Sequence, residues 1–363
     1  MGDYQVIARK WRPGKFSELV GQEHVARTMK NAIRLNRIAH AYLLVGPRGV
    51  GKTTTARIFA KALNCQHNTD GEPCGQCEIC RAIAAERCLD VVEIDAASRN
   101  SADSMRELAE EVRHMPVAAK YKVYIIDEVH MLSKAAWNAL LKTIEEPPAH
   151  VKFIFATTEA HQVLPTIVSR CQRFDLMPIP TKLIQERLAL IAANEGVNIS
   201  DGALAAISRA AQGGMRDAQS LLDQMIAFFS SGNDNTIDEK EVLALFGLTR
   251  GDELEKIVAA LLNNDRAAML RSTGECAKAG RNLETLLEDI LSFLRCVELA
   301  NIVPDPAELT EADAGTIQRA QRIAAASDPE KVERLIDILS PAGRPLRDAV
   351  NKLVYLEIGR AHV

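Results

Sequence analysis

The sequence predicts an α/β fold with a parallel sheet, and three observations lead to that prediction. The first is a set of short, nearly continuous apolar runs, typical of strands buried on both faces of a parallel sheet: 41–45, 91–94, 123–126 and 153–156. The second is the helical pattern between these runs, which gives βαβ alternation. The third is a glycine-rich loop that joins the first run to a helical stretch.

The composition is that of an ordinary globular protein, with 363 residues, 47% hydrophobic and 25% charged. Lys+Arg 44 against Asp+Glu 48 gives a formal net charge of −4, which argues against a protein that coats nucleic acid by bulk positive charge. No apolar run approaches the roughly 18 residues of a membrane span, and the N-terminus lacks a signal-peptide pattern. We therefore expect a cytoplasmic protein.

Two breaks predict three domains, spanning residues 1–178, 179–236 and 237–356. The prolines within 177–180 cannot lie in a central strand or a helix interior, and a polar loop at 230–235 forms the second break. Both later domains have helical patterns, with Ser200 and Asp201 as an N-cap and a helix from Met215 to about Phe229. The third domain contains an apolar stripe, read as a bundle core or an oligomerisation face: Leu283, Leu286, Leu287, Ile290, Leu294 and Val297.

The loop at 46–53 fits G-x-x-x-x-G-K-[ST] at every fixed position and lies between a strand and a helix. Backbone N–H groups of such a loop curl around phosphate oxygens, and the helix N-terminus adds partial positive charge. Lys52 can reach the β- and γ-phosphates, and the Thr53 hydroxyl can hold Mg²⁺. An incidental glycine-rich turn is the alternative. The predicted nucleotide-binding residues here are Gly46, Gly49, Val50, Gly51, Lys52, Thr53 and Thr54.

The third apolar run ends in Asp127 and Glu128, at the strand end where open α/β sheets bind ligands. We expect Asp127 to orient the Mg²⁺ shell and Glu128 to polarise the attacking water as general base. An ordinary acidic loop is the alternative. Thr157 and Thr158 follow the fourth run, where a hydroxyl can bond the γ-phosphate or the water, although threonine is also common at strand ends.

A turn-rich insert after the phosphate-loop helix contains four of the eight cysteines, spaced C-x8-C-x2-C-x2-C: Cys65, Cys74, Cys77 and Cys80. Four thiolates in a short polar loop predict a closed, structural tetrahedral zinc site whose metal supplies folding energy. An iron–sulfur cluster is the rival, although the C-x3-C-P continuation is missing, and unbound thiols are the third reading. His67 and Cys88 are spare candidate ligands. The incidental cysteines are Cys171, Cys276 and Cys296.

Two arginines stand out. Arg170, in a Ser-Arg-Cys triplet, reads most simply as a cation at a helix C-terminus, which the helix dipole favours. Arg216 lies in the first turn of a helix, where a cation is disfavoured. A nearby nucleotide phosphate explains its position, and neutralisation by Asp217 is the alternative.

Together these features resemble the AAA+ ATPase family and, more narrowly, the tau/gamma family of clamp-loader subunits of bacterial DNA polymerase III. The segments that carry the resemblance are 8–13, 46–53, the four-cysteine insert, 127–130, 140–148, 156–158, 169–171 and 214–217. The insert and the Ser-Arg-Cys triplet are far more specific than the phosphate loop. The implied architecture is an AAA+ domain with a zinc-binding insert at 65–80, a helical lid domain and an all-helical collar domain.

The resemblance also implies roles for single residues. Arg170 is expected to act as an arginine finger on ATP bound in the neighbouring subunit. Thr157 is expected to be the first sensor and Arg216, on the lid, the second. The adenine end of the site is assigned to Ala8, Arg12 and Pro13.

The implied activity is ATP hydrolysis that opens a sliding clamp and loads it on primed DNA, with ATP, Mg²⁺ and Zn²⁺ as cofactors. The implied partners are the delta and delta-prime subunits, further copies of this subunit, the clamp, primed DNA, and, through domains beyond this chain, the polymerase core and the helicase. Aromatic residues make up 4% and no basic-aromatic stripe stands out, so we expect DNA to be held by phosphate tracking with strong salt dependence.

Two other functions compete with this one. A non-hydrolysing scaffold like delta-prime shares the insert and the triplet but lacks a working phosphate loop. A branch-migration helicase shares the phosphate loop and the acidic pair but lacks the four cysteines. Residues 357–363 match the translation of a common sequencing adapter, so we expect them to be a sequence artefact; a genuine polar tail is the alternative.

Overall fold

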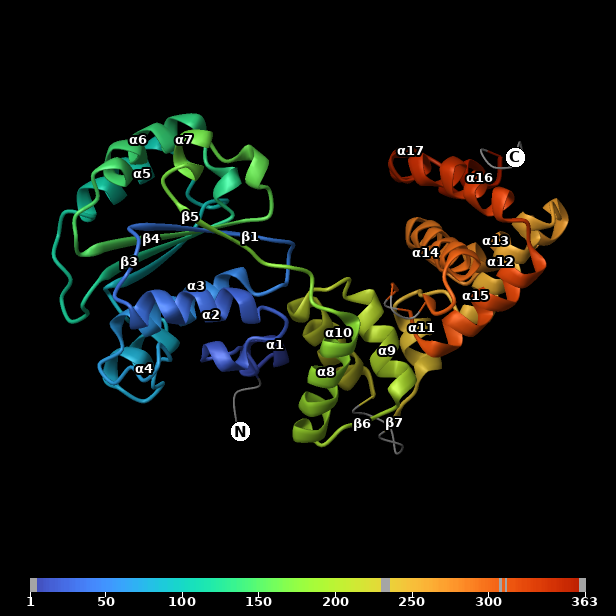
Figure 1. Cartoon of the computed structure of the whole chain (residues 1–363), viewed down its shortest axis with the longest axis horizontal. Helices are drawn as coiled ribbons and strands as arrows, with labels where there is room; N and C mark the ends of the chain where they lie inside the picture. The colour runs from blue at the N-terminus through green and yellow to red at the C-terminus, as the bar shows by residue number, and fades with distance from the viewer. Residues whose placement is uncertain (1–4, 230–235, 307–308, 311, 359–363) are drawn as a thin grey trace. The chain divides into compact units, whose positions relative to one another are not determined.

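The computed structural model describes residues 5–229, 236–306, 309–310 and 312–358 (Figure 1). The chain forms two compact units: Met1–Ile191 with Ala211–Gln224, and Ala192–Ala210 with Met225–Val363. These limits do not coincide with the breaks expected at residues 178 and 236, so the three-domain division stays a prediction. The polar loop at 230–235 lies outside the described residues, as do residues 359–363 of the expected artefact.

The first unit contains a five-stranded parallel sheet, which confirms the predicted fold class. Its strands are β1 (Ala41–Val45), β2 (Val91–Asp95), β3 (Lys122–Asp127), β4 (Val151–Thr157) and β5 (Gln172–Asp175), in the order β2-β3-β4-β1-β5. The four apolar runs form β1 to β4. Strand β5 was not predicted, because this short edge strand is polar apart from the buried Phe174 and pairs with β1 from a distant part of the chain.

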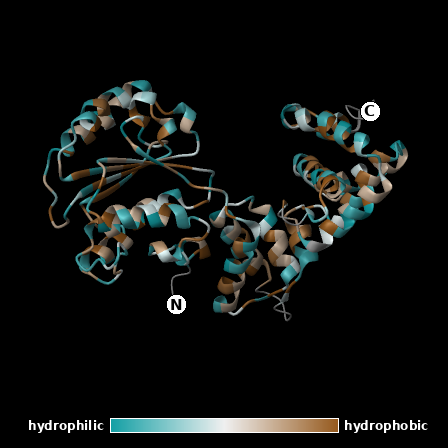
Figure 2. Cartoon of the chain, in the orientation of Figure 1, coloured by the Kyte–Doolittle hydropathy of each residue, from teal (hydrophilic) through white to brown (hydrophobic). Residues whose placement is uncertain are grey.

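Helices cover both faces of the sheet (Figure 1). Alternate β1 residues divide between the layers: Tyr42 and Leu44 pack toward α2 and α3, and Ala41 and Leu43 toward α5, α6 and α7. Figure 2 shows hydrophobic residues along the strands between these layers. The helices of this unit are α1 (Ile7–Lys10), α2 (Glu23–Arg34), α3 (Lys52–Asn64), α4 (Glu78–Ala84), α5 (Ala102–Glu111), α6 (Lys134–Glu145) and α7 (Pro165–Val168). Short 3₁₀ turns are η1 (Phe16–Glu18), η2 (Val129–Met131) and η3 (Ala160–Gln162).

Helices α8 (Thr181–Glu195) and α10 (Met215–Phe229) both begin in the first unit. Helix α10 has the bounds that the sequence predicts. Their N-terminal halves matter for function because Arg187 on α8, and Met215, Arg216 and Gln219 on α10, line the cavity described below.

In the part of the second unit that the structure describes, the regular structure is helical apart from a two-stranded parallel pair, β6 (Asn198–Ile199) and β7 (Thr236–Ile237). The predicted N-cap is confirmed, since Ser200 Oγ accepts the Ala203 N–H at 3.3 Å. All six residues of the apolar stripe on α14 are buried in the core of this unit, as the bundle-core reading expects. The helices are α9 (Asp201–Ala210), α11 (Glu239–Leu245), α12 (Gly251–Leu262), α13 (Arg266–Lys278), α14 (Leu283–Ile302), α15 (Ala314–Ala326), α16 (Pro329–Leu339), α17 (Gly343–Asp348) and α18 (Lys352–Ile358), with a 3₁₀ turn η5 (Ser340–Ala342). Within the described ranges, no helix combines the length and the apolar character needed to cross a bilayer.

Candidate nucleotide site and four-cysteine cluster

The predicted phosphate loop joins β1 to α3, and glycine is required at its bends. Gly49 and Gly51 have φ angles of 78° and 103°, which side-chain-bearing residues rarely adopt. A Cβ on Gly49 would also lie 2.6 Å from Asp217 Oδ2. The curl of the loop therefore depends on the glycines of the motif.

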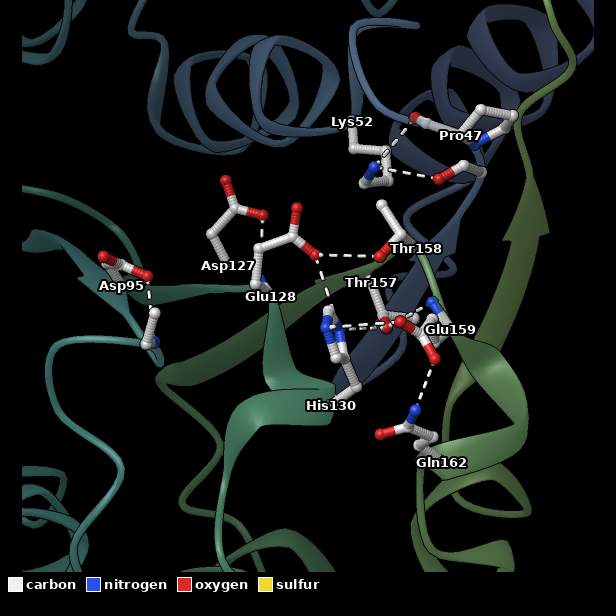
Figure 3. Close-up of polar contacts among 12 residues, drawn as sticks. Pro47, Lys52, Asp95, Asp127, Glu128, His130, Thr157, Thr158, Glu159 and Gln162 are labelled. Atoms are coloured by element: carbon white, nitrogen blue, oxygen red, sulfur yellow. Dashed lines mark hydrogen bonds and ion pairs between the residues drawn. The ribbon is translucent and has the colours of Figure 1, made fainter. Parts of the chain in front are cut away.

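Lys52 projects into this loop and is buried there (Figure 3). Its ammonium donates to the carbonyl oxygens of Gly46 and Pro47, at 2.8 and 2.9 Å. Burial lowers the pKa of Lys52, while the Glu128 and Asp127 carboxylates act in the opposite direction. A buried cation that donates to neutral carbonyls can exchange them for phosphate oxygens.

The acidic pair lies at the end of β3, next to the start of α3. Thr53 Oγ1 donates to Asp127 Oδ2 at 2.5 Å, so the two residues predicted to hold Mg²⁺ are in contact. A hydroxyl and a carboxylate are hard oxygen donors of the kind Mg²⁺ prefers. The donor set therefore fits that cation.

Glu128 has a left-handed backbone, with φ 48° and ψ 47°, and its N–H donates to Asp127 Oδ1 at 2.9 Å. Its Oε2 lies 3.4 Å from both His130 Nδ1 and Thr158 Oγ1 (Figure 3). Asp127 and Glu128 thus have different surroundings, in keeping with the separate roles predicted for them.

The two threonines at the end of β4 differ in their contacts. Thr157 is fully buried, and its Oγ1 contacts His130 Nδ1 at 3.1 Å and accepts the Glu159 N–H at 3.0 Å. Thr158, in contrast, reaches Glu128 directly. His130, which joins Glu128 to Thr157, was not predicted as a site residue. Its sequence signal is its place in the Asp-Glu-Val-His run.

A cavity of about 380 Å³ opens beside the loop, within the range of small-molecule sites. The predicted residues that line it are Ala8, Arg12, Pro13, Gly49, Val50, Gly51, Lys52, Thr53, Thr54, Asp127, Glu128 and Arg216. Gly46, Thr157 and Arg170 are not among its lining residues. The lining also includes residues that were not predicted, among them Trp11, Arg187 and Gln219. The Arg187 guanidinium lies 5.8 Å from the centre of the Trp11 ring, an interaction between distant segments that no local pattern reveals.

The cavity concentrates positive charge. Burial and the guanidinium groups of Arg57 and Arg216 lower the pKa of Arg12, although Glu93 partly offsets them. The Arg216 N–H donates to the Gly49 carbonyl at 3.2 Å, which ties α10 to the phosphate loop. Asp217 lies 4.0 Å from Arg48. Cationic side chains outnumber carboxylates in the lining, with Arg12, Arg48, Lys52, Arg187 and Arg216 against Glu18, Asp127 and Glu128, and this excess favours an anion in the cavity.

Arg170 follows α7, and its guanidinium contacts Thr166, Ser169 and Glu145 within its own chain. It donates to the Thr166 carbonyl at 2.7 Å and pairs with Glu145 at 2.8 Å. The first contact matches the simple reading of a cation at a helix C-terminus. About a third of its side chain is exposed (36%), so it is accessible to a second molecule.

The four cysteines of the insert come together, as predicted. The Sγ atoms of Cys65, Cys74, Cys77 and Cys80 all lie within 4.8 Å of one another. Zn–S bonds of about 2.3 Å in a tetrahedron place sulfurs about 3.8 Å apart, so the cluster fits one ion such as zinc. A cluster of several irons needs its thiolates further apart. Neither His67 nor Cys88 belongs to the group found among the described residues.

Backbone N–H groups support the thiolate form in this cluster. Cys74 Sγ accepts N–H bonds from Cys77 and Gln76, at 3.3 and 3.4 Å, and these bonds lower the pKa of Cys74 to about 6. Cys65 Sγ and Cys77 Sγ each accept one N–H as well, from Cys74 at 3.3 Å and from Cys80 at 3.5 Å, whereas burial raises the pKa of Cys65 and Cys80. Outside the cluster, burial raises the pKa of Cys171 to about 12. The insert therefore has the chemistry of a metal-binding loop.

Three family models match consecutive parts of the chain. One described as the DNA polymerase III delta subunit matches residues 21–180. One described as the ATPase lid domain of a DNA polymerase III clamp loader subunit matches residues 183–232. One described as domain III of the DNA polymerase III subunits gamma and tau matches residues 237–359.

Curated relatives agree with these models. DNA polymerase III subunit tau of Bacillus subtilis is 39% identical over 358 residues, which are 98% of this chain and 62% of the relative. The tau subunit of Escherichia coli is 42% identical over 301 residues, 83% of this chain and 46% of the relative. The gamma subunit of Buchnera aphidicola is 40% identical over 302 residues, which cover 83% of this chain and 82% of the relative. The chain thus spans about half to two thirds of the tau subunits named here.

A solved structure supports the fold alone. A mutant of RuvB from Thermotoga maritima aligns with a TM-score of 0.51 at 20% identity, covering 71% of this chain and 81% of that protein. Parallel sheet, phosphate loop and lid helices define an AAA+ ATPase-type fold with a four-cysteine insert and a helical third domain. Within this class the chain belongs to the tau/gamma family of DNA polymerase III clamp-loader subunits.

Proposed function

We propose that this chain binds and hydrolyses ATP as the motor subunit of the clamp loader, which opens the sliding clamp and loads it on primed DNA during replication. One observation carries the proposal: a single cavity is lined by a buried loop lysine, a Thr53–Asp127 pair and the carboxylate Glu128. A scaffold subunit has no need of all three.

Each group has a distinct task. Lys52 and the loop N–H groups bind the β- and γ-phosphates, and the hydroxyl of Thr53 with the Asp127 carboxylate holds Mg²⁺. The bound cation neutralises charge on the phosphate oxygens. Ala8, Arg12 and Pro13 line the adenine end of the cavity, and Val50, Thr54 and their glycine neighbours complete the cradle.

Glu128 is the proposed general base. A water between its carboxylate and the γ-phosphate gives up a proton to Glu128 as its oxygen attacks the γ-phosphorus. The bond from that phosphorus to the β,γ-bridging oxygen breaks at the same step, and ADP is the leaving group. His130 and Thr158, each 3.4 Å from Oε2, orient the carboxylate. Thr157 acts as the first sensor through its contact with His130, at 3.1 Å.

Two arginines complete the site in the assembled ring. Arg216, beside the phosphate loop, serves as the second sensor. Arg170 acts in trans on ATP in a neighbouring subunit. Its guanidinium leaves the ion pair with Glu145 and binds the phosphoryl group instead. A finger supplied by a neighbour makes hydrolysis depend on assembly, because its charge stabilises the transition state only in the ring.

The remaining parts are proposed to be structural. Zinc at the four cysteines stabilises the insert, residues 1–178 and 179–236 form the ATPase and lid domains, and residues 237–356 form the collar. The proposed partners are delta, delta-prime, further tau/gamma copies, the clamp and primed DNA, and the proposed location is the cytoplasm. DNA is held by its phosphates.

Phosphate release by loaders assembled with and without clamp and primed DNA tests this function. Arg170→Ala should bind ATP normally but lose stimulated turnover by about 10³-fold, a typical value for an arginine finger. Arg173→Ala is the matched control, because Arg173 pairs with Asp175 at 2.6 Å on the same surface strand. Unchanged stimulated turnover of Arg170→Ala refutes the finger, and no turnover in the wild-type loader favours the scaffold reading.

A further inference from the structure

We propose that Glu72, in the four-cysteine insert, is a positioning residue that holds one wall of the nucleotide cavity. This wall is the N-terminal segment 8–20, which contributes lining residues at both of its ends. The insert is defined as residues 65–80. The inference rests on the proposed function, since it assigns that cavity to ATP. It gives the insert a task beyond its own folding.

Glu72 reaches the N-terminal segment through both carboxylate oxygens. Oε2 accepts the Phe16 N–H at 2.9 Å, and Oε1 accepts the Ser17 N–H at 3.0 Å. Lys30 Nζ lies 3.3 Å from Oε1 and balances its charge. Only 19% of the Glu72 side chain is exposed, and the charge-assisted bond from Phe16 is partly buried, whereas the bond from Ser17 is exposed.

The segment that Glu72 holds is embedded in the cavity wall. Residues 14–17 lie between two stretches that line the cavity, one ending at Pro13 and the other beginning at Glu18. The Gly14 carbonyl accepts a hydrogen bond from Lys61 Nζ at 2.8 Å. Lys61 lies on α3, the helix that begins at Lys52. The wall is thus fastened on one side to the insert and on the other to the phosphate-loop helix.

The wall has little regular structure of its own. Helix α1 has 4 residues and η1 has 3, so neither is long enough to fix its own position. Anchors from outside the segment therefore determine where Ala8, Trp11 and Arg12 stand. When a mutation removes an anchor, the wall is correctly placed in only a fraction of the molecules. The apparent dissociation constant for nucleotide then equals the intrinsic value divided by that fraction.

The insert in turn fixes the backbone of Glu72. The Glu72 N–H donates to the Thr69 carbonyl at 2.9 Å, closing a turn. Gly71 in that turn has φ 79°, and a Cβ there would lie 2.8 Å from the Lys30 backbone. Cys74, one of the cluster cysteines, follows two residues later. The geometry of the cluster is therefore transmitted to the cavity wall through a short, tightly packed turn.

The test compares Glu72→Ala, Glu72→Gln and wild type as full chains, titrated with a fluorescent ATP analogue. Glu72→Ala should raise the Kd about 10-fold, equivalent to a wall in place about a tenth of the time. Glu72→Gln keeps one acceptor oxygen and should give an intermediate Kd. In assembled loaders, KM for ATP should rise while kcat stays within about twofold, and each variant should keep the wild-type metal content.

Asp70→Asn is the matched control, since Asp70 lies in the same turn as Glu72 and pairs instead with Lys30 and Arg34 of α2. It should bind nucleotide like the wild type. A wild-type Kd in both Glu72 variants overturns the inference alone. Loss of metal from Glu72→Gln also overturns the inference, because Glu72 would then stabilise the metal-binding insert rather than position the cavity wall. A wild-type chain that binds no nucleotide overturns the proposed function.

Discussion

Glu128→Gln separates ATP binding from ATP hydrolysis in this site. The change replaces one carboxylate oxygen with an amide nitrogen and keeps the size of the side chain. The Lys52 contacts with the loop carbonyls and the Thr53–Asp127 contact involve none of the altered atoms. The polar neighbours of Oε2, His130 and Thr158, also remain.

The expected loss of rate follows from the role of Glu128 as base. A positioned general base contributes about 10²- to 10⁴-fold, which is about 3–5 kcal/mol at 1.36 kcal/mol for each factor of ten. The dissociation constant for ATP should change by less than about 3-fold. Removing a negative charge near the phosphates favours binding, if it has any effect.

Single-turnover phosphate release in loaders assembled with clamp and primed DNA measures this rate, alongside the Kd for ATP. Glu159→Gln is a suitable control, because Glu159 lies 4.0 Å from the other ring nitrogen of His130 and is 42% exposed. It should hydrolyse ATP at nearly the wild-type rate. Wild-type phosphate release from Glu128→Gln would refute Glu128 as the base.

Two further predictions concern stability. Burial alone raises the pKa of Asp90, but N–H bonds from residues 117–119, at 2.7, 2.8 and 2.8 Å, outweigh it and lower the pKa. Asp90→Asn should therefore cost about 2–3 kcal/mol of unfolding free energy in urea at pH 7. The contribution is present above the unfolded pKa of about 3.9 and is lost as pH falls through the folded pKa, so the gap to wild type should shrink below about pH 4; a constant gap contradicts this. Cys77→Ser should lower both metal content by mass spectrometry and Tm, and an unchanged Tm at full loss of metal would show that the insert folds without it.

The sequence predicts features that depend on neighbouring residues. The phosphate loop, the acidic pair and the four cysteines are local spacings, and the structure brings each set together. The strands β1 to β4 and the stripe on α14 follow from local periodicity. The burial of these strands and of the stripe is what their apolar patterns predict.

Features that depend on distant residues escape such patterns. Strand β5 exists because Gln172–Asp175 pairs with β1, although its residues are mostly polar. Glu72 meets Phe16 across 56 residues, and Arg187 meets Trp11 only because α8 packs beside the N-terminal segment. The local periodicity of the sequence does not predict these long-range contacts.

The most direct test of the central claim is the rate of phosphate release by a loader assembled from this chain and its partner subunits, compared with a loader that carries Lys52→Ala. Clamp and primed DNA should accelerate release by the wild-type loader. Lys52→Ala should show no stimulated release, because the cavity has lost the cation that binds the phosphates. Equal release by both loaders, or none by the wild type, would contradict an ATP-driven motor.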